Sequence, residues 1–163
     1  MSKCGLYEHD FYAWTNEQAA LLRSGQLAAA DIQHIAEEIE SMGKTEKREL
    51  LSRLSVLLLH LLKWQFQPSR RGASWEVTIR NQRRDIIDHL ADNPSLKVRL
   101  QETLAAAYER AADNAYAETG LARAVFPSIC PWSFEQIMDM DFWPETDSLE
   151  PELRSIAPAA GRP

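Results

Sequence analysis

One pair of side chains has the types and the spacing to carry chemistry. Arg84 precedes His89 by five positions, and Asp85 follows the arginine directly. An arginine can stabilise the charge of a phosphate, and a histidine can transfer protons to or from a ribose hydroxyl. The pair therefore allows the hypothesis of metal-independent RNA cleavage, with Arg84 and His89 as weak catalytic candidates.

This spacing resembles that of HEPN ribonucleases, which are small helical bundles that dimerise to build their site. The chain holds 13 arginines and 4 histidines, so an arginine followed five to seven residues later by a histidine is expected about once by chance. In the alternative interpretation, Arg84 and His89 are solvated groups beside a core contact of Ile86 and Ile87, and Asp85 pairs with His89. We favour this alternative.

Other chemistries have less support. Carboxylate-bridged di-metal bundles need Glu-x-x-His pairs, and the sequence contains none. His34 and His60 would lie about 39 Å apart on a continuous helix, too far to share an ion. His60 stands in an aliphatic run and is expected in the core, whereas His34 is expected to be solvated beside Glu37 and Glu38. Cys130 has no base near it in sequence, and the six glycines form no phosphate loop. We therefore expect no metal and no cofactor.

The charge of the chain is unevenly distributed. The net charge of −6 is the sum of −5 over residues 1–43, +7 over residues 44–84 and −8 over residues 85–163. A basic face of this kind can contact phosphates, and Trp64, Phe66 and Trp75 are near enough to stack on bases. The candidate nucleic-acid-binding residues are Lys63, Arg70, Arg71, Arg80, Arg83 and Arg84. With a sequence pI of 5.2, we expect instead that the acidic segments neutralise much of this face within the chain.

Apolar periodicity predicts an all-α fold, a single-domain bundle of four main helices plus a short C-terminal helix. The longest helix runs to Phe66 and is expected to bend near Gly43, where its apolar pattern lapses. Arg80, Arg83 and Arg84 would share one exposed side of the following helix, whose core side carries Trp75, Ile79, Ile86 and Leu90. The expected helix starts, in chain order, are Asp10 or Thr15, Asp31, Ser74, Pro94 and Ser133, the last in a capping box with Gln136.

Size and composition place the chain among globular proteins with one domain. We expect a helical domain over residues 1–145 and a loosely ordered, Pro- and Ala-rich tail over residues 146–163. The aromatic segment that holds Phe126, Trp132 and Trp143 either plugs one end of the bundle, which we favour, or forms an exposed patch that binds a partner. The start of the chain lacks a signal-type apolar stretch, no run is long enough to span a membrane, and the two cysteines form no framework. We therefore expect a cytoplasmic protein.

Several motifs carry a family resemblance. HLLKWQFQP is followed by SW, then by NPSL and by FPSICPWSFEQIMD. In this combination the chain closely resembles the domain of unknown function 29 family over residues 6–145. The resemblance implies an all-helical fold, and it implies no activity, so no catalytic residue can be transferred from it.

The favoured hypothesis on function is a noncatalytic intracellular helical module that binds another protein or itself. The first alternative is a nucleic-acid-binding protein that uses the basic residues between positions 63 and 84. The second is the HEPN-like ribonuclease described above. Protein is thus the expected partner, nucleic acid the less favoured one, and no membrane is expected.

Overall fold

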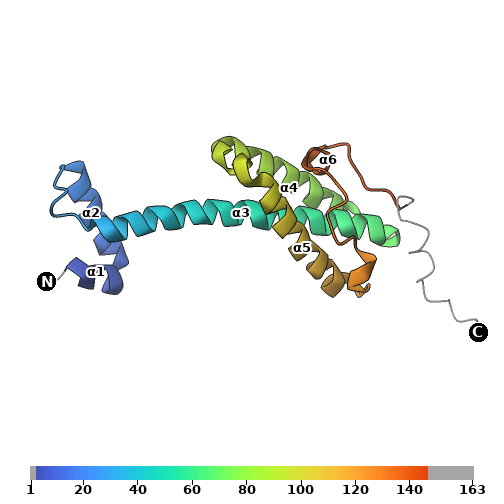
Figure 1. Ribbon diagram of the computed structural model, residues 1–163, viewed down its shortest axis with the longest axis horizontal. Coiled ribbons are helices and arrows are strands. Elements are labelled where there is room, and N and C mark those ends of the chain that lie inside the picture. Colours follow the sequence, from blue (N-terminus) through green and yellow to red (C-terminus); the bar gives the residue numbers. More distant parts are fainter. Residues whose placement is uncertain (1–2, 147–163) are drawn as a thin grey trace, which may run out of the picture. The chain divides into compact units, whose positions relative to one another are not determined.

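The computed structural model describes residues 3–146, which contain helices and no strand (Figure 1). This confirms the predicted all-α fold class. The predicted C-terminal tail lies outside the described residues from position 147 on. The α-helices are α1 (Lys3–His9), α2 (Phe11–Arg23), α3 (Ile32–Phe66), α4 (Ala73–Asp92), α5 (Leu100–Thr119) and α6 (Phe134–Met138), and the 3-10 helices are η1 (Pro68–Arg70), η2 (Pro94–Arg99) and η3 (Arg123–Val125).

The chain divides into two compact units, Met1–Glu46 and Lys47–Pro163. The helix α3 contributes its first part to one unit and its second part to the other. It is a single helix of 35 residues that includes Gly43, and the bend expected near Gly43 stays a prediction. The predicted domain boundary at residue 145 stays a prediction.

The first unit consists of α1, α2 and the start of α3. As predicted, α2 begins after Asp10, whose carboxylate accepts a hydrogen bond from the backbone N–H of Ala13 at 3.0 Å. The helix ends at Ser24, and Gly25 follows with φ +72°, a left-handed conformation that favours glycine. Trp14 is buried in this unit. The helix α1, which precedes α2, was not predicted from the sequence.

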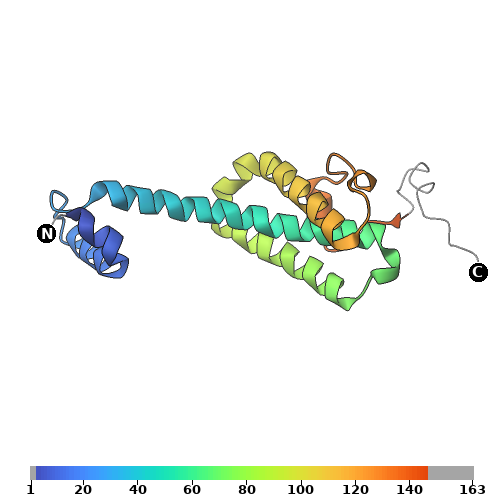
Figure 2. The same cartoon turned by 90° about the horizontal axis from the view of Figure 1, so that it is seen from below.

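The second unit is built around the leucine-rich part of α3. The seven buried leucines of this part span about 200° of the helix circumference, so a wide face must be covered, whereas Ser52 on the remaining side is exposed. Figures 1 and 2 both show α4 and α5 alongside this part of α3. The buried apolar side chains are Leu50, Leu54, Leu57, Leu58, Leu59, Leu61 and Leu62 from α3, Ile79, Ile86 and Leu90 from α4, and Leu104, Ala107, Tyr108, Ala111, Ala112 and Ala115 from α5.

The aromatic segment after α5 closes this core, as the sequence predicts. Phe126 and Trp132 are buried, and the ring of Phe126 packs edge-to-face on Phe66 with centroids 5.0 Å apart. The predicted capping box is present at α6, where Ser133 and Gln136 exchange side-chain and backbone hydrogen bonds. The aromatics therefore belong to the core rather than to an exposed patch.

Two predicted helix starts are wrong. The helix α4 begins at Ala73 with Gly72 in the N-cap position, so Ser74 lies inside the helix. Pro94 begins the 3-10 helix η2 rather than an α-helix, and α5 starts only at Leu100. In both places the capping rule identified a turn but not the residue at which the α-helical hydrogen bonds begin.

Arg83 is the largest departure from the predicted pattern. It is fully buried in phase with Ile79 and Ile86, although the sequence analysis placed it on the exposed side with Arg80 and Arg84. Its Nε donates to the carbonyl oxygen of Ile137 at 2.7 Å, and its Nη2 donates to that of Phe142 at 2.8 Å. Burial lowers the pKa of Arg83 to about 10, so the guanidinium still carries its charge at neutral pH. The side chain therefore ties the C-terminal segment to α4.

Substitution of Arg83 tests whether its hydrogen bonds to the C-terminal segment stabilise the fold. We expect Arg83→Ala to lower the free energy of unfolding by about 3 kcal/mol, because two carbonyl oxygens lose a charged donor and the core loses volume. Arg84→Ala is the matched control, since its side chain is exposed one position further along α4, and it should change stability by less than about 0.5 kcal/mol. Urea unfolding followed by circular dichroism measures both. Equal effects of the two substitutions would contradict the role assigned to Arg83.

Candidate functional site

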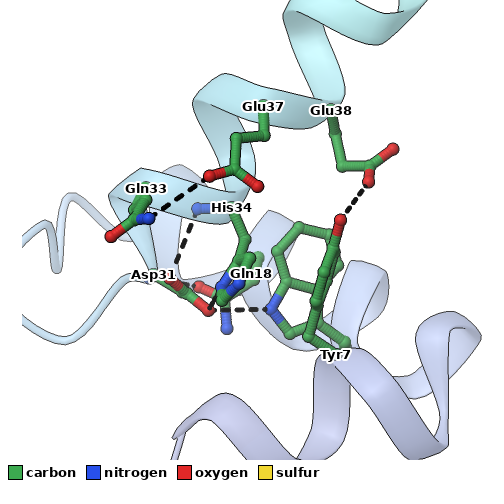
Figure 3. Close-up of polar contacts among 8 residues, drawn as sticks. Tyr7, Gln18, Asp31, Gln33, His34, Glu37 and Glu38 are labelled. Carbon is green, nitrogen blue, oxygen red and sulfur yellow. Dashed lines mark hydrogen bonds and ion pairs between the residues drawn. The ribbon is translucent and has the colours of Figure 1, made fainter.

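A cluster of polar and aromatic side chains holds the first unit together (Figure 3). The imidazole Nδ1 of His34 lies 2.7 Å from Oδ2 of Asp31, and the ring stacks on Tyr7 with centroids 4.0 Å apart. The hydroxyl of Tyr7 donates to Oε1 of Glu38 at 2.5 Å. We call Tyr7, Asp31, His34 and Glu38 the Tyr7–His34 cluster. It connects α1 with α3.

Asp31 is positioned by its place just before α3. As predicted it occupies the N-cap position, where its Oδ1 accepts a hydrogen bond from the backbone N–H of His34 at 3.4 Å. The backbone N–H of Asp31 itself donates to Oε1 of Gln18 at 2.7 Å, and the indole of Trp14 donates to its Oδ2 at 3.4 Å. The carboxylate of Asp31 therefore accepts hydrogen bonds from the backbone at the start of α3 and from the indole of Trp14, and it also pairs with the imidazole of His34.

The structure corrects the predicted surroundings of His34. We expected a solvated histidine beside the two glutamates that follow it, but the imidazole pairs with Asp31, three residues before it. Glu38 accepts from Tyr7, and Glu37 accepts from Gln33 at 3.2 Å. The signal that could have found the pair is the Asp-x-x-His spacing, which puts both side chains on one face of the first helical turn.

The cluster shifts the titration of its members. The hydrogen bond with Asp31 raises the pKa of His34, and the same bond lowers the pKa of Asp31. The hydrogen bond to Glu38 raises the pKa of Tyr7 to about 12. Tyr7 therefore stays protonated at neutral pH and acts as a hydrogen-bond donor, not as a base.

The two nuclease candidates do not converge within one chain. Arg84 is exposed whereas His89 is buried, because five positions on an α-helix turn the side chain by about 140°. Asp85, which was expected to pair with His89, accepts from Nη1 of Arg53 at 2.7 Å. Ile87 is exposed and does not share the core contact of Ile86.

Most of the candidate nucleic-acid-binding residues make contacts within the chain. Lys63 forms an ion pair with Glu118 at 2.7 Å and lies over the ring of Trp75. Arg71 donates to the carbonyl oxygen of Trp64 at 2.7 Å. Both cations are therefore held close to the fold.

The remaining cations differ in exposure. Arg80 pairs with Glu76 at 3.3 Å and lies over the ring of Trp143, and Arg83 is buried as described above. Arg70 and Arg84 are exposed. The structure therefore does not bring the six cations together as one open basic face.

Two histidines of the second unit bear on metal binding. Glu49 and His89 place ligand atoms within 4.8 Å of each other, but Arg53 already donates to Oε1 of Glu49 at 2.8 and 3.0 Å. His60 lies with Nδ1 2.8 Å from the carbonyl oxygen of Val56, and burial lowers its pKa. The hydrogen bond agrees with the prediction, but His60 is half-buried rather than in the core.

A cavity of about 520 Å³ lies beside α5, with Tyr108, Cys130 and Trp132 among its lining residues. The thiol of Cys130 donates to the carbonyl oxygen of Trp132 at 3.4 Å, and burial raises the pKa of this thiol. A protonated thiol is a poor nucleophile. The cavity therefore does not define a cysteine-based active site.

The first part of α3 exposes a row of large apolar side chains. Ile32, Ile39 and Met42 retain 52%, 63% and 68% of their accessible surface. At about 100° per residue they fall on one side of the helix, whereas His34 and Glu38 point towards α1 from a neighbouring side. We call Ile32, Ile39 and Met42 the α3 stripe. Within residues 5–146 it is a row of exposed apolar side chains on a regular helix.

These features define an all-α protein that exposes an apolar helix face. The chain belongs to the family described as Domain of unknown function DUF29, whose model matches residues 6–143. This confirms the resemblance found in the sequence motifs. No curated protein and no solved structure matches the chain. Over the described residues, no helix combines the length and the apolar character that crossing a membrane requires.

The Asp31–His34 pair predicts a titration that can be measured. The pKa of His34 should lie above its ordinary value of 6.5, and Asp31→Asn should bring it down, because the negative partner of the imidazolium is lost. The contribution of His34 to stability is then present below pH 6.5 and lost as the pH rises through its raised pKa. That of Asp31 is lost as the pH falls through its lowered pKa. NMR titration of the imidazole measures the effect, and Asp141→Asn in the second unit is the control. An unchanged titration in Asp31→Asn would contradict the pairing.

The engaged cations predict weak nucleic-acid binding. We expect no appreciable affinity for labelled duplex or single-stranded probes at about 50 mM salt, where phosphate contacts are strong. Fluorescence anisotropy measures this. Submicromolar binding that falls steeply with salt, and that is lost when Arg70, Arg71 and Arg80 are changed to Glu, would contradict the expectation and favour the nucleic-acid alternative.

Proposed function

We propose that this protein is a noncatalytic helical module that binds another protein through the α3 stripe. The observation that carries the proposal is the exposure of Ile32, Ile39 and Met42 in a row on one face of a regular helix. Exposed apolar patches of this kind mark interaction surfaces on soluble proteins. A row on a helix is the form in which one helix packs on another.

The distribution of exposed apolar side chains supports the first unit as the binding part. Among the described residues, seven of the twelve large apolar side chains that remain exposed lie before residue 47. Burying a side chain of this size stabilises a complex by about 1.5–3 kcal/mol. Three such residues on one helix therefore contribute apolar surface to a contact with a partner.

A cytoplasmic location is part of this proposal. Cys130 is a half-buried free thiol, which fits a reducing compartment. The catalytic alternative has less support, because Arg84 and His89 lie on different sides of α4.

A comparative capture experiment tests the proposed function. Tagged wild-type protein, the double variant Ile39→Ser with Met42→Ser, and the control Val98→Ser would be incubated with lysate of the source cells, with and without nuclease. Val98 is 86% exposed in the second unit, so the control removes an apolar side chain elsewhere. We expect a protein that is retained by wild type and control, resists nuclease and is lost with the double variant. Retention that depends on nucleic acid, or that survives in the double variant, would overturn the proposal.

A further inference from the structure

The α3 stripe is accompanied by a glycine that the fold of the chain does not require. Gly43 lies inside α3 with an ordinary helical φ. Over the described residues, and apart from its own stretch of helix, no atom would lie within 4 Å of a Cβ added there. Glycine is the least favourable residue in a helix interior apart from proline. Among the described residues, no contact therefore explains a residue that weakens α3.

Gly43 lies on the same face as the stripe. At about 100° per residue, Ile32, Ile39, Met42 and Gly43 fall within an arc of about 100°. When helices pack, side chains of one helix enter the spaces between side chains of the other. A missing side chain between bulky neighbours deepens such a space and lets a foreign backbone approach. The arrangement therefore suits a partner helix.

The charge of the first unit indicates the charge of the partner helix. Residues 1–46 carry eight acidic and three basic side chains, a net charge of −5. Glu40 is exposed on α3 about 60° around the helix from Gly43. A second copy of this unit would bring like charges together, whereas lysines and arginines beside an apolar face would be attracted.

We infer that the partner segment is a basic amphipathic helix that packs on the α3 stripe with its backbone against Gly43. This inference rests on the proposed function and names the partner chemistry for the same surface. Apolar residues of the partner contact Ile39 and Met42, and its cations are attracted by the acidic side chains of the unit. The charge of the unit disfavours a second copy of the same surface as the occupant.

The probe for this inference is a synthetic peptide of about 18 residues, long enough for about five helical turns, with leucines on one face and lysines on the other. A scrambled peptide of the same composition keeps the charge and loses the apolar face. Isothermal titration calorimetry with the full chain should show binding of the first peptide and at least about tenfold weaker binding of the second. Ile39→Ser should weaken the amphipathic peptide about tenfold, and Val98→Ser should leave it unchanged.

Gly43→Ala tests whether the partner helix packs closely against α3 or is held only by the attraction of opposite charges. It should raise the thermal midpoint of the protein, because alanine favours the helix, and yet weaken peptide binding about tenfold, because its methyl group fills the space. Ser41→Ala is the matched control on the opposite side of α3. It also favours the helix but should leave binding unchanged.

Each result decides between stated alternatives. Equal affinity for the scrambled peptide, or unchanged binding in Gly43→Ala, would overturn the basic-helix inference while the capture experiment could still support the proposed function. Sedimentation that shows a dimer lost in Ile39→Ser would overturn the inference in favour of a second copy. Failure of both the peptide and the capture experiment would overturn the proposed function itself.

Discussion

The second unit depends on one constraint, which is that α3 carries seven buried leucines over more than half of its circumference between positions 50 and 62. An apolar face of this width must be covered by more than one element. Two helices, α4 and α5, cover part of it, and α5 does so largely with alanines, which let the helix axes approach closely. The remaining surface at the end of the helix is closed by the irregular aromatic segment that holds Phe126 and Trp132.

This way of closing the core explains the buried charge of Arg83. An irregular segment brings backbone carbonyl groups into the core that no helix or sheet satisfies, and each needs a donor. Arg83 supplies two of its N–H groups to Ile137 and Phe142. Trp143 packs on Trp64 with centroids 4.6 Å apart and lies under the guanidinium groups of Arg80 and Arg83. Arg83 therefore contacts the aromatic segment both through its hydrogen bonds and through the ring of Trp143.

Features that depend on residues close in the sequence can be predicted from it, whereas contacts between distant segments cannot. Local rules located the caps at Asp10 and Ser133, and the leucine run predicted the core helix. Arg83 was misplaced because its charge was weighed above its phase with Ile79 and Ile86, which was the available signal. The hydrogen bond between Tyr7 and Glu38 joins residues 31 positions apart, so neither periodicity nor capping rules could reveal it. The candidate nuclease and nucleic-acid residues failed to converge for the same reason, since spacing alone does not state which face of a helix is covered.

The two parts of α3 also show why the stripe points to binding. In the second part the apolar residues are explained by burial, because other segments of the same unit cover them. In the first part, Ile32 and Ile39 stay exposed, and isoleucine is a poorer helix former than alanine, glutamate or lysine. Neither helix formation nor packing within the unit therefore accounts for isoleucine at these positions. Under the proposed function, burial against a second polypeptide would account for them and for the glycine that lies beside them.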